Sequence, residues 1–85
     1  MLEADVRERL RRFILLDLMR DPQYPLADDE PLVTGGVLDS FAIAQIAVFA
    51  EHEFQVYIPD SDMTPDSMDT LGQMVRRIMR DEGAP

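Results

Sequence analysis

Prolines and glycines divide this chain of 85 residues into helical segments joined by one long connection. Those in the connection are Pro22, Pro25, Pro31, Gly35 and Gly36. Both residue types disfavour helix and strand interiors, so residues 22–38 are predicted to form an irregular connector. It still contains apolar residues that can pack on neighbouring helices, namely Tyr24, Leu26, Leu32 and Val33. We therefore expect an ordered loop and no domain boundary, in a single domain that spans residues 1–85.

Apolar residues at helical spacing predict three main helices. The first spans residues 2–19 and the second residues 40–54. The third follows Asp69 or Thr70, one of which is expected to cap it. Residues 55–59 contain one short apolar run, which gives a strand no partner and therefore predicts a loop. The predicted fold class is all-α, a three-to-four helix bundle with a long loop between the first two major helices.

Acidic and basic residues lie in different parts of the chain. All eight basic residues are arginines, placed in the first 20 residues or after position 75. Residues 21–75 contain eleven acidic residues and no basic one. This acidic segment would repel nucleic acid and attract a basic patch on a partner protein. Without cysteine, and without an apolar run near the roughly 18 residues of a membrane span, we expect a cytoplasmic protein. We also expect it to be a monomer.

Residues 36–41 (Gly-Val-Leu-Asp-Ser-Phe) form a turn that leads into the second helix. This turn places Asp39 and Ser40 at the helix start, where unpaired N–H groups and the macrodipole stabilise a phosphate group. Serine and aspartate are also favoured N-caps, so a plainer interpretation is that one of them only caps the helix. Both interpretations remain open at this point.

The second helix has apolar residues on nearly every side. We expect an inward face that includes Phe41, Ala44 and Phe54, with Ala47 or Val48 between them. Such a wide apolar surface implies either deep burial or an exposed patch that is available to a partner.

Two other chemistries fail on the residues present. Residues 60–62 resemble the start of a calcium loop, but Pro65 and Leu71 stand where glycine and glutamate are needed. A serine-hydrolase site would need a base near Ser40, and the only histidine, His52, lies several helical turns away. The sequence thus predicts no metal site and no catalytic residue.

Several of these features occur in the order found in acyl carrier proteins, which the chain resembles over most of its length. The matching segments are residues 38–41 (Leu-Asp-Ser-Phe), 51–54 (Glu-His-Glu-Phe), 58–60 (Ile-Pro-Asp) and 69–71 (Asp-Thr-Leu). The resemblance implies that Ser40 bears a 4′-phosphopantetheine arm donated by coenzyme A. It also implies that Asp39 takes part in docking to the phosphopantetheinyl transferase.

The resemblance further implies a stand-alone carrier that is not an enzyme. Acyl or aminoacyl groups would be carried as thioesters on the arm, and partner enzymes would supply the chemistry: an acyl or aminoacyl ligase or acyltransferase, and a ketosynthase or other biosynthetic enzyme. Residues 41–50 lack the acids that carriers of primary fatty-acid synthesis tend to have there, which favours a specialised polyketide, peptide or lipid pathway. The residues expected to contact partners are Phe41, Ala42, Gln45, Val48, Phe49, Glu51, Asp60 and Asp62.

Two alternative functions and the roles of three residues stay open. A D-alanyl carrier would share the arm and differ only in its cargo. An acidic helical adaptor without a prosthetic group would lay its second helix into a partner groove, with Ser40 as a simple cap. Finally, Phe49, Met63 and Met68 can fill the core, whereas Phe49 could instead contact a partner and the methionines could line the region where a carried group rests.

Overall fold

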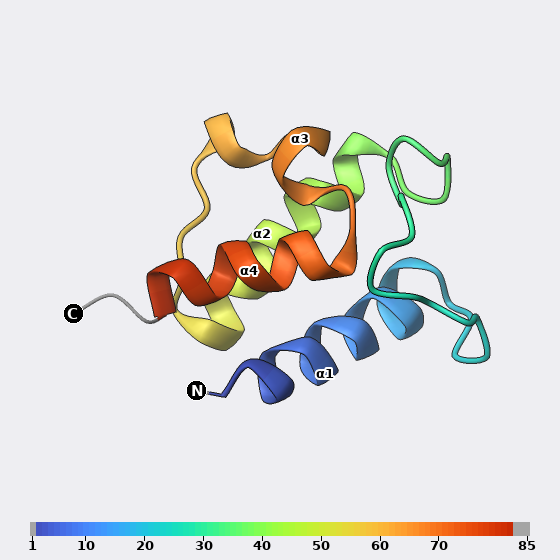
Figure 1. The fold of residues 1–85 in the computed structure, drawn as a ribbon, viewed down its shortest axis with the longest axis horizontal. Helices are drawn as coiled ribbons and strands as arrows, with labels where there is room; N and C mark the ends of the chain where they lie inside the picture. The colour runs from blue at the N-terminus through green and yellow to red at the C-terminus, as the bar shows by residue number, and fades with distance from the viewer. Residues whose placement is uncertain (1, 83–85) are drawn as a thin grey trace.

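The computed structural model describes residues 2–82, which form an all-α fold without strands (Figure 1). In chain order its helical elements are α1 (Glu3–Phe13), η1 (Ile14–Leu18), α2 (Ser40–Phe54), η2 (Asp60–Asp62), α3 (Pro65–Met68) and α4 (Leu71–Glu82). Helix α4 packs against α1, α2 and α3, and α1 runs opposite to α2 and α4. The predicted small helical bundle with a long first loop is confirmed.

The first helix ends in a wider turn that the sequence did not predict. Element η1 is π-helical, and the N–H of Met19 donates to the carbonyl of Ile14 over 2.8 Å. The chain then leaves the helix through Arg20, whose φ of 54° is left-handed, and the N–H of Asp21 donates to the Leu15 carbonyl. A left-handed residue at this position ends the helix in the way that a glycine usually does. The helix therefore ends just before Asp21-Pro22, as expected.

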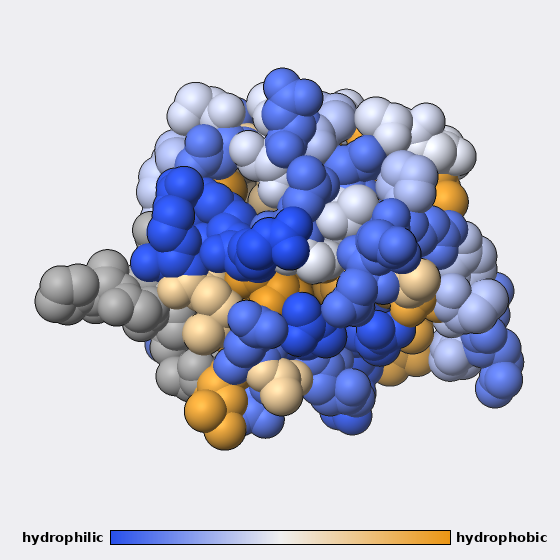
Figure 2. Space-filling view, viewed as in Figure 1, coloured by the Kyte–Doolittle hydropathy of each residue, from blue (hydrophilic) through white to orange (hydrophobic). Residues whose placement is uncertain are grey.

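One contiguous core holds the helices together. Its members are the apolar faces of all four α-helices together with residues of the two long connections, including Leu26, Leu32, Val56 and Ile58. The apolar residues that recur at helical spacing in α4 face this core: Leu71, Met74, Val75 and Ile78 are fully buried, and Met79 is partly buried against them. Hydrophilic side chains cover most of the face seen in Figure 2, and hydrophobic ones reach that surface in small patches.

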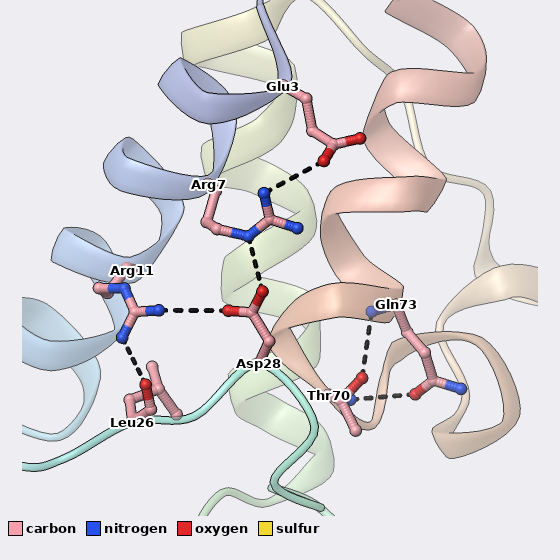
Figure 3. A network of polar contacts seen from close by, with 7 residues as sticks. All are labelled: Glu3, Arg7, Arg11, Leu26, Asp28, Thr70 and Gln73. Carbon is pink, nitrogen blue, oxygen red and sulfur yellow. Dashed lines mark hydrogen bonds and ion pairs between the residues drawn. The ribbon is translucent and has the colours of Figure 1, made fainter.

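The connector between η1 and α2 is fastened to both α1 and α4 through Asp28 (Figure 3). The Asp28 carboxylate pairs with Arg7 Nε at 2.9 Å and with Arg11 Nη2 at 3.2 Å. The Asp28 carbonyl accepts a hydrogen bond from the N–H of Gly72 in α4, and Arg11 also donates to the carbonyl of Leu26. The expected ordered loop is confirmed, and its apolar anchor Leu32 is fully buried.

Asp69 fastens the same connector a second time, at the turn between α3 and α4. Its carboxylate accepts hydrogen bonds from the N–H groups of Val33 and Thr34, at 2.8 and 3.0 Å, and from the Thr34 hydroxyl at 2.7 Å. Its carbonyl accepts from the N–H of Leu32. The segment that leads to α2 is thus held against the start of α4.

Thr70, rather than Asp69, caps α4. The Thr70 hydroxyl accepts from the N–H of Gln73, and the Gln73 side-chain carbonyl accepts in return from the N–H groups of Thr70 and Asp69 (Figure 3). This reciprocal arrangement is a capping box, in which each side chain satisfies backbone donors that the helix start leaves free.

Helix α2 has the predicted bounds but a different inward face. Its buried residues are Ala42, Ile43, Ile46, Ala47, Ala50 and Phe54. Phe41 and Val48 were expected to contribute to that face but are 70% and 58% exposed. Apolar residues lie on nearly every side of α2, so their spacing in the sequence does not indicate which face is buried. Packing against α1 and α4 determines the buried face.

The chain between α2 and α4 contains one helix that was not predicted. The sequence reads as a polar turn at Pro65, yet residues 65–68 form α3, with the proline in the first turn. The short helical turn η2 precedes it. Met68 of α3 is fully buried, and Met63 is partly buried against the core. Both methionines therefore serve as core residues in this structure.

Candidate functional site

A tight turn delivers the chain to Asp39 and Ser40. The N–H groups of Val37 and Leu38 both donate to the Leu32 carbonyl at 2.8 Å. Gly36 has a φ of 81°, a left-handed conformation that glycine adopts without steric cost. Leu38 is buried at the end of the turn, so the following two residues emerge at the surface.

Asp39 caps α2, and Ser40 does not. The Asp39 backbone is extended, with φ −104° and ψ 179°, and its Oδ1 accepts from the N–H of Ala42 at 2.9 Å. Ser40 is the first residue inside the helix. Its side chain is exposed and makes no hydrogen bond with any residue from 2 to 82. The serine hydroxyl is therefore available at a helix start, where the partial positive charge of the macrodipole is concentrated.

The surface beside Ser40 is partly apolar, with the Asp39 carboxylate as its charged group. A shallow depression of about 210 Å³ adjoins it and is lined by Leu18, Val37, Leu38, Asp39, Phe41, Ala42 and Gln45. Phe41 and Val48 project from α2 into solvent, and the Gln45 side chain is exposed between them. These three residues follow one another at helical spacing and form an exposed stripe on α2. The sequence did not point to Leu18 as a neighbour of Ser40, because only the fold brings its segment there.

The other residues expected to contact partners fall into three environments. Glu51 and Asp60 are exposed and make no ion pair within residues 2–82. Ala42 was expected to touch partners, but this was wrong, because it is only 6% exposed and belongs to the core. Asp62 is engaged with Arg77 and Arg80 of α4.

Phe49 is part of an aromatic cluster between helices. Its ring stacks on Phe13 of α1 with centroids 4.3 Å apart, and it meets Phe54 edge-on at 5.7 Å. Phe49 remains only partly buried. It therefore belongs mainly to the α1–α2 packing, and only its outer edge can contribute to a docking surface.

Arg77 has a structural role that the sequence alone does not indicate. It lies on α4, is only 7% exposed, and its Nε donates to Asp62 Oδ2 at 2.9 Å. Arg80 approaches the same oxygen at 3.5 Å. The Arg77–Asp62 contact fixes η2 to α4. No local sequence signal distinguishes Arg77 from the exposed arginines beside it.

Two groups away from Ser40 have shifted pKa values. The hydrogen bond to Glu30 raises the pKa of the Tyr24 hydroxyl. Hydrogen bonds from Thr34 lower the pKa of the Asp69 carboxyl. Both groups stabilise the connector, and neither lies in the depression beside Ser40.

Metal-binding and membrane-spanning features are not found in the described part of the chain. No three acidic, histidine or cysteine side chains of residues 2–80 converge as metal ligands. Among residues 2–82, none of the helices combines the length and apolar character that a bilayer crossing requires.

No family model matches the sequence, and the search of curated proteins finds no significant match.

Proposed function

We propose that this chain is a carrier protein, modified on the Ser40 hydroxyl with 4′-phosphopantetheine, as its resemblance to acyl carrier proteins implies. The observation that carries the proposal is the division of roles between Asp39 and Ser40. Asp39 Oδ1 satisfies the N–H of Ala42, so the helix has its cap without the serine. The Ser40 side chain is left exposed and without a hydrogen bond within residues 2–82.

The surroundings of Ser40 suit a phosphodiester. A phosphate joined to this hydroxyl would lie at the start of a helix of 15 residues, where free N–H groups and the helix dipole stabilise negative charge. The buried Leu38 before it and the buried Ala42 after it hold the serine in place. When bound, the group would supply a terminal thiol that carries acyl or aminoacyl cargo as a thioester.

The exposed stripe of Phe41, Gln45 and Val48 is the surface proposed for partner enzymes. It begins directly after Ser40 and continues along α2 for two helical turns. Its contacts would be apolar rather than ionic, which favours partners from a specialised polyketide, peptide or lipid pathway. Glu51 and Asp60, both exposed, would add attraction for basic residues at the rim of such a partner.

Intact-mass measurement tests the proposal. The purified chain is incubated with coenzyme A, magnesium and a promiscuous phosphopantetheinyl transferase. We expect a single phosphopantetheinyl increment in the wild type and in Ser61→Ala, which removes another exposed serine. We expect no increment in Ser40→Ala.

The outcome distinguishes the carrier from the adaptor. An unmodified but folded wild type would refute the carrier and favour a partner-binding helical adaptor. An increment that persists in Ser40→Ala would place the modification elsewhere.

If Ser40 is the modified residue, the cargo is identified by loading the modified protein with acyl and aminoacyl ligases, with D-alanine as one candidate.

A further inference from the structure

A second surface, independent of Ser40, lies between α1 and α2. It is an open groove of about 530 Å³, lined by Arg9, Arg12, Phe13, Leu16, Asp17, Phe49 and Glu53. We call it the α1–α2 groove. Its floor is the Phe13–Phe49 stack, and Leu16 is 46% exposed beside it. Both phenylalanines also line an adjoining, mainly apolar depression of about 370 Å³.

On the α1 side of this groove, a positive charge and a negative charge flank two apolar residues. Arg12 precedes Phe13, and Asp17 follows Leu16. Arg12 makes one long contact, 3.5 Å, with Glu8. Asp17 is exposed and has no ion pair within residues 2–82. The groove therefore offers one loosely held cation and one unpaired anion.

This order is self-complementary under two-fold symmetry. When two copies of the helix pack antiparallel about an axis between Ile14 and Leu15, Arg12 lies opposite Asp17 of the second copy. Phe13 then lies opposite Leu16 of the second copy. Each contact occurs twice, because a two-fold interface pairs residue i with j and j with i. Opposite charges thus meet at both edges, and apolar side chains meet between them.

The groove is also the place where two acidic copies can approach with little repulsion. The chain carries a formal net charge of −9, which opposes association over most of its surface. Within the groove, Arg9 and Arg12 balance Asp17 and Glu53, and Arg9 already pairs with Glu53 at 2.7 Å. Salt at physiological strength screens the remaining charges beyond about 8 Å.

We propose that the α1–α2 groove is a self-association surface, through which two copies of the chain form an antiparallel, two-fold dimer. Reciprocal Arg12–Asp17 ion pairs flank the Phe13 and Leu16 contacts in this dimer. The proposal revises the expectation of a monomer. It does not depend on the proposed carrier function, because the residues that define the contact are on α1 and η1 rather than at Ser40.

Sedimentation equilibrium of the full chain tests this surface, over protein concentrations from about 10 μM to 1 mM. We expect reversible dimer formation in the wild type. Arg12→Asp and Asp17→Arg should each weaken the dimer about tenfold, since each replaces two attractive contacts by two repulsive ones. The double variant Arg12→Asp/Asp17→Arg restores both pairs with the signs exchanged, so it should dimerise like the wild type.

Matched controls separate the local contact from the change in net charge. Arg76→Asp and Asp29→Arg alter the charge equally, at exposed residues that line a different depression, and should leave the dissociation constant within about twofold of wild type. Thermal unfolding followed by circular dichroism shows that each variant is folded. A wild type that is monomeric at every concentration would overturn the proposal, as would single variants that dimerise like their controls, or a double variant that is not restored.

Discussion

Arg77 of α4 donates a 2.9 Å hydrogen bond from Nε to Asp62 Oδ2, and this pair joins η2 to the core side of α4. Arg77 is nearly buried, whereas Asp62 is partly exposed, with 7% and 28% of their side chains accessible. A charge in this position requires its partner, because desolvation without an ion pair is costly. The contact therefore ties the chain that follows α2 to the last helix, in addition to the hydrogen bonds that Gln73 makes with Asp69 and Thr70.

Removal of the carboxylate should destabilise the protein. Asp62→Ala is expected to lower the free energy of unfolding by about 2 kcal/mol, the usual effect of deleting a hydrogen bond to a partly buried charge. Asp60→Ala removes an exposed acid of the same turn and should change it by less than about 0.5 kcal/mol. Urea unfolding measures both, and equal effects would show that the ion pair does not stabilise the fold.

Substitutions at the start of α2 should separate capping from modification. Asp39→Ala removes the side chain that accepts from Ala42 and is expected to cost about 1 kcal/mol. Ser40→Ala should change stability by less than about 0.5 kcal/mol, because its hydroxyl makes no hydrogen bond within residues 2–82. Thermal unfolding distinguishes the two variants. A larger loss in Ser40→Ala would assign the capping role to the serine.

Asp69 should make part of the stability dependent on pH. Hydrogen bonds from Thr34 hold the pKa of the Asp69 carboxyl below its ordinary value of 3.8. A carboxyl with a lowered folded-state pKa stabilises the protein above its unfolded pKa, and this contribution is lost as the pH falls through the folded pKa. Asp69→Asn should therefore reduce the drop in melting temperature between about pH 6 and pH 3. Asp29→Asn, at an exposed carboxylate, is the control, and an identical drop in both variants would contradict this role.

The turn before α2 should tolerate a methyl group at one glycine better than at the other. A Cβ at Gly35 would lie 2.1 Å from the backbone oxygen of Pro31, so Gly35→Ala requires the backbone to move and is expected to cost about 2 kcal/mol or more. Gly36 has open space around it but a φ of 81°, so Gly36→Ala should cost about 1 kcal/mol. Urea unfolding tests the order, and the reverse order would show that conformation outweighs the steric clash.

The bounds of α2 could be predicted from the sequence, but not the direction of its faces. The turn before Ser40 and the end of the apolar run at Phe54 are local signals, and both were located correctly. The choice of Ala42 over Phe41 for the core depends on the helices that pack against α2. Likewise, whether Asp39 or Ser40 caps the helix depends on one backbone angle, since both residue types suit the position.

Contacts between distant residues account for the other differences. Arg77 and Asp62 are 15 positions apart, and burial of an arginine cannot be recognised without knowing its partner. Helix α3 is a single turn of four residues, too short for a periodic pattern, and Pro65 is as compatible with a turn as with a helix start. The π-helical turn at Ile14–Leu18 similarly depends on how a run of apolar residues fits the core.

The attachment of the connector at Asp69 has a consequence for local opening. The amide hydrogens of Val33 and Thr34 are bonded to that carboxylate, so they exchange with solvent only when the connector separates from the start of α4. The turn that holds Ser40 follows within a few residues and is bonded back to Leu32. Exchange at these amides therefore reports how often the connector, from which the turn to Ser40 leads, separates from the start of α4.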